Sequence, residues 1–183
     1  IWDRLEILSK PVRYRQVLIP ELGIHMRSAY TPKLLRVFDT VAENITVNPD
    51  WKADEKIYFS RSRLRKAGFF ECGGDLLDDF FARNGYTLLY PETLPLDEMI
   101  FRIRGASVVA SLSGSLPHNM LFAKSGQTLE IVERLVLNID NQVDVNRIRD
   151  LNVTYIDAHY PIYPVDFTGP IVMGYTPELT RFA

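Results

Sequence analysis

Apolar positions in the middle of this chain follow two patterns that alternate from about residue 56 to residue 132. In the longer segments, apolar side chains recur every three or four positions, which predicts amphipathic helices. Between them lie short runs that are apolar almost throughout, which is typical of strands buried on both faces of a parallel sheet. We expect helices at 32–43, 75–83 and 95–104, a short helix opened by Pro117, and strands at 16–19, 57–60, 86–90, 106–112 and 128–132.

The regular alternation of strand and helix predicts the fold class. An α/β fold follows, with a Rossmann-like parallel sheet flanked by helices. Past residue 138 the pattern weakens, and we expect a helix at 143–150 and a strand at 154–157. The segment 159–174 holds three prolines and two glycines, so we expect an ordered tail over the domain, closed by a short helix at 176–182.

Composition narrows the class of protein. The chain has 183 residues, 46% of them hydrophobic, and a net charge of −2, so nothing pulls it as a whole toward nucleic acid. Cys72 is the only cysteine, which excludes an internal disulfide and suits a reducing compartment. No apolar run approaches the length of a membrane span. We therefore expect a cytoplasmic protein, with a membrane-peripheral location as the alternative.

The first candidate site follows the predicted strand at 57–60. Ligands of open α/β sheets bind outside the carboxyl ends of the strands. Here Arg61, Arg63, Arg65 and Lys66 concentrate positive charge directly after a buried strand. Arginine grips phosphate through two parallel hydrogen bonds, which favours an anion site. A solvated basic loop is the alternative.

The second candidate follows the strand at 106–112. Gly114 lets a phosphate approach the backbone, and the helix behind it offers free N–H groups. The side chains of Ser113, Ser115, His118 and Asn119 add hydrogen-bonding groups. The alternative is a plain turn between strand and helix, with Ser115 as a cap and His118 packed.

Metal chemistry has little support in the sequence. The three histidines are scattered, and one cysteine gives no zinc-binding spacing. No Asp-x-Asp triplet occurs, and Asp75, Asp78 and Asp79 resemble the solvated face of a helix. Gly73 and Gly74 would suit an anion-binding nest, but a loop ending at the Asp75 cap is the simpler interpretation.

The order of these motifs resembles glycosyltransferase family 61. Tyr58-Phe59-Ser60-Arg61 with Arg65 is similar to that family's (Y/F)-x-S-R-x-x-x-R segment. The later landmarks follow in the family's order, and the similarity extends from about residue 56 to residue 133. They are Gly85-Tyr86, Leu88-Leu89, Pro91-Glu92, the helix 94–103, the strand 106–112, Gly114-Ser115, His118-Asn119 with Phe122, and Glu130 in the last strand. Ser113 stands where many members have His, and Cys72-Gly73-Gly74 where many have Asn-Glu.

The resemblance implies the C-terminal, donor-binding lobe of a two-lobed GT-B fold. Residues 1–183 would form one nucleotide-sugar-binding lobe, with a core at about 15–140 and a C-terminal extension at 141–183 packed on it. The acceptor lobe would lie outside this chain, and the isolated lobe would be inactive. The expected activity is inverting, metal-independent sugar transfer to a glycan or capsular polysaccharide, without a cofactor.

The resemblance also implies roles for single residues. Arg61 and Arg65 would neutralise the donor diphosphate, and Glu130 would accept ribose hydroxyls. The second site, Ser113-Gly114-Ser115 with His118 and Asn119, would bind the diphosphate or the sugar, and His118 would supply the imidazole that Ser113 lacks. The general base is left unassigned.

Two other functions stay open. One is a glycosyltransferase-like lobe that binds its ligand without turnover. The other is an unrelated Rossmann-type nucleotide-binding protein, such as a phosphotransferase. The oligomeric state, the donor and the acceptor do not follow from the sequence.

Overall fold

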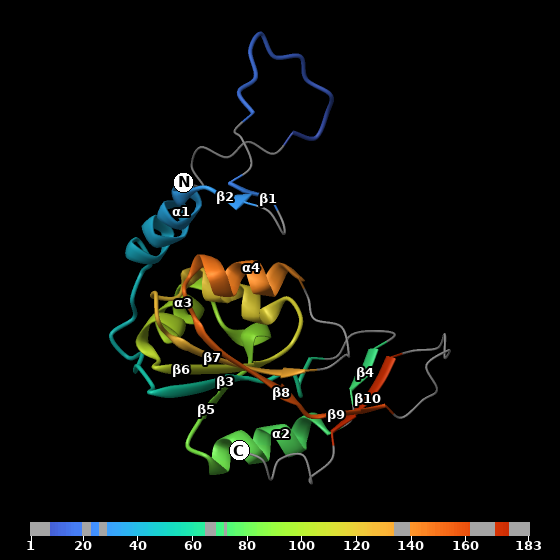
Figure 1. Cartoon of the computed structure of the whole chain (residues 1–183). Helices are drawn as coiled ribbons and strands as arrows, with labels where there is room; N and C mark the ends of the chain where they lie inside the picture. Colours follow the sequence, from blue (N-terminus) through green and yellow to red (C-terminus); the bar gives the residue numbers. More distant parts are fainter. Residues whose placement is uncertain are drawn as a thin grey trace.

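A five-stranded parallel sheet forms the centre of the molecule (Figure 1). The computed structural model describes residues 8–19, 23–25, 29–64, 69–71, 73–133, 140–161 and 171–175. The strands lie in the order β5-β3-β6-β7-β8. Their bounds are β3 (Lys56–Phe59), β5 (Thr87–Leu89), β6 (Val108–Leu112), β7 (Thr128–Glu133) and β8 (Asn152–Asp157). The predicted α/β, Rossmann-like class is confirmed.

Helices cover both faces of this sheet (Figure 1). On one face lies α2 (Gly74–Arg83). On the other face lie α3 (Leu96–Gly105), the 3-10 helix η3 (Leu116–Phe122) and α4 (Asp140–Ile148). Helix α1 (Pro32–Glu43) packs outside this second layer, where Phe38 meets Phe122 edge to face at 5.1 Å. A short 3-10 turn, η2 (Pro91–Thr93), links β5 to α3.

Alternate side chains of each strand enter different halves of the core. Ile57 and Phe59 of β3 join the cluster beneath α3, η3 and α4, whereas Tyr58 joins the cluster beneath α2. Tyr58 stacks on Phe81 of α2, with ring centroids 4.0 Å apart. A strand buried on both faces needs apolar residues at successive positions, which explains the continuous apolar runs.

The chain reverses its direction of winding between β3 and β6. From β3 it passes through α2 to β5 on one side, then through α3 to β6 on the other side of β3. Numbered along the chain, the five parallel strands have the order 2-1-3-4-5, with a topological switch point between the first and third. At such a point the connections leave in opposite directions and open a crevice at the carboxyl edge.

The strand expected at 16–19 is wrong. These residues are not in a strand, and Val17, Leu18 and Ile19 are 63%, 85% and 87% exposed. An apolar run forms a strand only where a neighbouring strand accepts its hydrogen bonds, and this segment pairs with none of the described strands. The fifth strand of the sheet is β8, which matches the strand predicted at 154–157 but belongs to the core rather than to an extension that begins at residue 141.

Two small sheets were not predicted. Strands β1 (Ile24–His25) and β2 (Ala29–Tyr30) form an antiparallel pair. Strand β10 (Ile171–Tyr175) pairs with β9 (His159–Pro161) and, in parallel, with β4 (Phe69–Glu71). Part of the expected tail is therefore sheet, paired with a segment about 100 residues earlier. The helix expected at 176–182 lies outside the described residues.

Candidate ligand site at the carboxyl edge of the sheet

Both predicted sites lie at the carboxyl edge of the sheet. They follow β3 and β6, the two adjacent strands at the switch point. Phe59 of β3 is paired with Ser111 of β6, and Arg61 and Ser113 each follow this pair by two residues. Neighbouring strands are ~4.8 Å apart, which brings the starts of the two loops side by side. Sequence reasoning had identified the two loops without knowing that their strands are adjacent.

Ser60 organises the loop that leaves β3. It is fully buried, and its Oγ accepts a hydrogen bond from the N–H of Ser62 at 3.0 Å and donates to Ser62 Oγ at 3.1 Å. Its N–H donates to the carbonyl of Leu89 at 2.9 Å, which extends the pairing with β5. The N–H of Leu64 donates to the carbonyl of Arg61 at 2.9 Å and closes a turn. The loop therefore has a defined path, with Arg61 half-buried at its start.

Asp78 of α2 is hydrogen-bonded to this loop. Ser62 Oγ donates to its Oδ2 at 2.6 Å, a separation typical of a hydroxyl bound to a carboxylate. The phenol of Tyr90, the residue after β5, donates to the same oxygen at 3.3 Å. The sequence predicted that Asp75, Asp78 and Asp79 are solvated. This prediction is wrong for Asp78, which is half-buried, and right for Asp75 and Asp79, which are exposed.

Tyr90 connects Asp78 to Arg63. The guanidinium carbon of Arg63 lies 3.7 Å from the centre of the Tyr90 ring. Burial and the charge of Asp78 raise the pKa of the Tyr90 phenol, while the charge of Arg63 lowers it. Sequence reasoning missed Asp78 and Tyr90 because their partners lie in other elements, up to 16 residues away, and no local spacing marks them.

The start of α2 packs closely against the same loop. A Cβ added at Gly74 would lie 3.3 Å from the Cα of Ser62, so a larger residue would push the loop away. Gly73 has φ 81°, a left-handed conformation that favours glycine. These two glycines therefore allow the loop after β3 to approach the N-terminus of α2. Cys72 and Arg65 lie outside the described residues.

The second loop offers less than its sequence suggested. Ser113 is buried and its N–H donates to the carbonyl of Val132 at 2.8 Å, so that N–H is engaged within the sheet. Gly114 has φ 139°, which only glycine adopts readily. Ser115 is exposed, and its side chain makes no capping hydrogen bond. The helix behind it is a seven-residue 3-10 helix, so the aligned dipole expected from an α-helix is small.

His118 and Asn119 are turned into the fold. Asn119 Nδ2 donates to the carbonyl of Leu116 at 2.9 Å. The Nε2 atom of His118 is buried and meets no hydrogen-bonding partner within the described part of the chain. Burial lowers the pKa of this imidazole, so the neutral form is favoured. In this conformation His118 does not present Nε2 to a ligand at the edge.

Glu130 lies apart from these residues. It is in the middle of β7, paired in register with Ala110 of β6, and its side chain faces the α2 layer. Its Oε2 accepts a hydrogen bond from the Tyr86 phenol at 2.7 Å, and Lys56 Nζ lies 5.3 Å from the centre of the Tyr86 ring. Burial and the Glu130 carboxylate raise the pKa of Tyr86. The carboxylate expected to bind ribose therefore already has a partner inside the fold.

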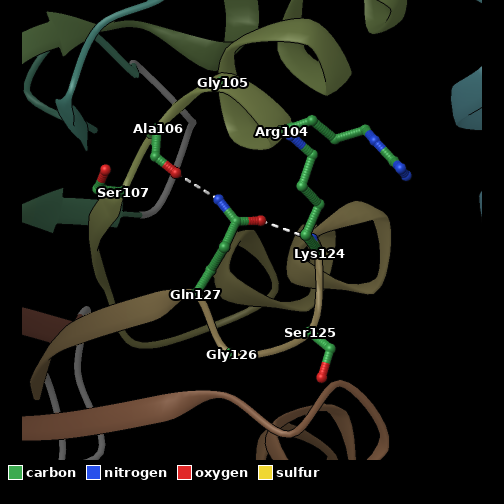
Figure 2. A pocket seen from close by; sticks show the side chains of 8 residues that line it. All are labelled: Arg104, Gly105, Ala106, Ser107, Lys124, Ser125, Gly126 and Gln127. Carbon is green, nitrogen blue, oxygen red and sulfur yellow. Dashed lines mark hydrogen bonds between the residues drawn. The ribbon is translucent and has the colours of Figure 1, made fainter.

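A shallow pocket of about 390 Å³ opens at the opposite, amino edge of the sheet (Figure 2). Gln127 braces it: its Nε2 donates to the carbonyls of Ala106 and Ile103, and its Oε1 accepts from the N–H of Lys124 at 2.6 Å. The pocket borders the C-terminal end of α3, whose negative polarity disfavours a phosphate. It is lined by Arg104, Gly105, Ala106, Ser107, Lys124, Ser125, Gly126 and Gln127.

Comparison with known proteins adds no assignment. No family model matches this sequence, and a search of curated proteins gives no match. Within the described residues, no helix has the length and apolar character needed to cross a bilayer. The same residues hold no group of three or more His, Cys, Asp or Glu side chains placed to bind a metal.

Proposed function

We propose that this chain binds a nucleotide-sugar at the carboxyl edge between β3 and β6 and serves as the donor lobe of a glycosyltransferase. One observation carries the proposal. The basic loop that begins at Arg61 and the Gly114 turn start side by side, at the switch point where open α/β sheets bind phosphorylated ligands. The order of motifs that resembles glycosyltransferase family 61 supplies the sugar-transfer part.

The basic loop would hold the diphosphate. During sugar transfer this group leaves and its negative charge grows, so fixed cations stabilise the transition state more than the ground state. Arg61 is half-buried at the start of this loop, and Arg65 follows it by four positions in the sequence. Gly114 would let the ligand approach the backbone of the opposite loop. Inversion also requires a general base at the acceptor, which in a two-lobed enzyme can come from the other lobe.

Three of the ligand contacts that the sequence predicted involve side chains that the structure directs elsewhere. Glu130 is bonded to Tyr86 in the middle of the sheet, Asn119 is bonded to Leu116, and His118 faces inward. We therefore assign the donor contacts to the two loops, with Ser113, Gly114 and Ser115 on one side and Arg61 and Arg65 on the other.

Titration calorimetry with UDP-sugars and GDP-sugars tests the proposal. We expect one class to bind the wild type, and Arg61→Ala and Arg65→Ala to weaken binding about tenfold or more, as loss of a charge-assisted hydrogen bond to phosphate does. Arg83→Ala is the matched control, because Arg83 ends α2 and its side chain is 81% exposed. Absence of binding for every sugar nucleotide, or unchanged binding in both loop variants, would refute the proposal.

A second candidate is a nucleotide-binding protein unrelated to sugar transfer. The observation that favours it is the strand order 2-1-3-4-5, which is also the flavodoxin-like order. A thermal-shift panel of ATP, dinucleotides, FMN and sugar nucleotides separates the two. Stabilisation by ATP, a dinucleotide or FMN alone would select this second candidate.

A further inference from the structure

Arg63 is held by an aromatic ring rather than by a carboxylate. Its guanidinium carbon lies 3.7 Å from the centre of the Tyr90 ring, and among the described residues no carboxylate forms an ion pair with it. Stacking uses the flat face of a guanidinium and leaves its in-plane N–H donors available. An exposed arginine that is fixed in this way has little conformational freedom left to lose when it binds an anion, so binding costs less entropy.

The ring under Arg63 is itself fixed. The Tyr90 phenol donates to Asp78 Oδ2 at 3.3 Å, and Ser62, which precedes Arg63, donates to the same oxygen at 2.6 Å. Asp78 thus links the backbone that carries Arg63 to the ring on which Arg63 stacks.

Asp78 maintains this arrangement at some energetic disadvantage. Its other oxygen, Oδ1, is buried and meets no hydrogen-bonding partner among the residues that the structure describes. A buried carboxylate oxygen without a donor destabilises the folded state. The two hydrogen bonds that Asp78 does accept come from Ser62 and Tyr90, the two residues that hold Arg63 in place.

From these contacts we propose that Arg63 is a phosphate-binding residue at the carboxyl edge of the sheet, on the β5 side of β3, and that Asp78 is the residue that positions it, through Tyr90 and Ser62. The inference rests on the proposed function only in taking the ligand to be phosphorylated. Among the four cations of this loop, the resemblance implied a diphosphate contact for Arg61 and Arg65 only, and the contacts of Arg63 extend that role to it. The inference also explains the half-buried aspartate of α2.

Calorimetry on the full chain with inorganic pyrophosphate as the probe tests the role of Arg63. Arg63→Ala is expected to weaken binding about tenfold. Arg63→Lys should recover only part of the loss, because an ammonium group neither stacks as a plane nor donates as a fork. Arg83→Ala is expected to bind as the wild type does. Wild-type affinity in Arg63→Ala, or no binding of pyrophosphate to the wild type, would overturn the inference.

A set of substitutions at Asp78 and Tyr90 tests the positioning role. Asp78→Ala and Tyr90→Phe break the same link, so each should weaken binding and the double variant should be no weaker than Asp78→Ala. Asp78→Asn keeps an oxygen that accepts from Ser62 and Tyr90, and should restore affinity to within about threefold. Asp79→Ala, on the exposed side of the same helix, is the matched control.

The opposite pattern would contradict positioning. Removing a negative charge near an anion site tightens binding if Asp78 acts only by repulsion, and then Asp78→Ala and Asp78→Asn would both bind pyrophosphate more tightly. Additive losses in the double variant would also count against a shared link.

The inference and the proposed function fail in different ways. Arg63-dependent pyrophosphate binding without affinity for any sugar nucleotide would remove the proposed function and leave the inference standing. Sugar-nucleotide binding that is unaffected by Arg63→Ala would do the reverse.

Discussion

Asp39 Oδ1 of α1 lies 3.0 Å from Nη1 of Arg149, the residue that follows α4. The same oxygen lies 3.4 Å from Arg104 Nη1 of α3. Arg149 is only 5% exposed and also donates to the carbonyl of Leu121. One carboxylate therefore holds three helices together on the face of the sheet opposite α2.

Replacing that carboxylate should destabilise the fold. Asp39→Ala leaves Arg149 buried with only a carbonyl partner, and loss of one member of a buried pair is strongly destabilising. Because Asp39 itself is 37% exposed, solvent reduces the effect, and we expect a loss of about 2 kcal/mol in the free energy of unfolding in urea. Asp79→Ala removes an exposed pair with Arg83 and should change it by less than about 0.5 kcal/mol. Equal effects of the two substitutions would argue against the linking role of Asp39.

Gln127 should be sensitive to small changes. Its side chain is buried and satisfies the carbonyls of Ile103 and Ala106 and the N–H of Lys124. Gln127→Leu has a similar size but leaves these groups unpaired, and we expect a loss of about 2–3 kcal/mol by urea unfolding. Gln127→Glu should be at least as harmful, because a carboxylate would face two carbonyls. A Gln127→Glu protein as stable as the wild type would contradict this account of the hydrogen bonds.

The Tyr86–Glu130 bond predicts a pH dependence on the alkaline side. The fold raises the pKa of Tyr86 above its ordinary value of about 10, so the folded state retains the proton longer than the unfolded state. The resulting stabilisation is complete below about pH 10 and is lost as the pH rises above it. Tyr86→Phe should lower the free energy of unfolding by about 1 kcal/mol at pH 7, with a gap that narrows above pH 10. A gap that widens there would show that the sign of the pKa shift is wrong.

His118 predicts the corresponding dependence on the acid side. Burial lowers its pKa below the ordinary value of about 6.5, so the unfolded state takes up the proton first. The stability that comes from the neutral imidazole is complete above about pH 6.5 and is lost as the pH falls. The wild type should therefore lose more stability than His118→Phe between pH 7 and pH 5. An NMR titration of His118 that gives a pKa above 6.5 would contradict this.

Local patterns predicted much of the sheet and its helices. Helix α1 was predicted with its observed bounds, and strands β3, β5, β6 and β7 of the central sheet were each placed within two residues. A buried parallel strand and an amphipathic helix are both recognisable from the apolar pattern of a short segment. The segment 16–19 has the same continuous apolar pattern but does not form a strand. Its apolar residues had no adjacent strand, and pairing is decided by the whole fold.

For the candidate site, the sequence identified loops but not contacts. The motif at Arg61 and the turn at Gly114 were both visible, and both lie at the carboxyl edge. Asp78 was taken for a solvated residue because its helix is amphipathic and its partners, Ser62 and Tyr90, come from segments before and after that helix. Glu130 was placed at the site, whereas the structure bonds it to Tyr86.

By itself, the sequence determined the α/β class, the positions of the strands of the central sheet and of the helices that cover it, and the two loops rich in phosphate-binding residue types. These follow from interactions within a few residues, namely helical and strand periodicity and the residue types at the ends of elements. The tertiary structure decided which strands are neighbours, and therefore that the loops of Arg61 and Gly114 start side by side. It also decided that Asp78 fixes Tyr90 beneath Arg63, because contacts across elements depend on packing of the whole chain and have no local signature.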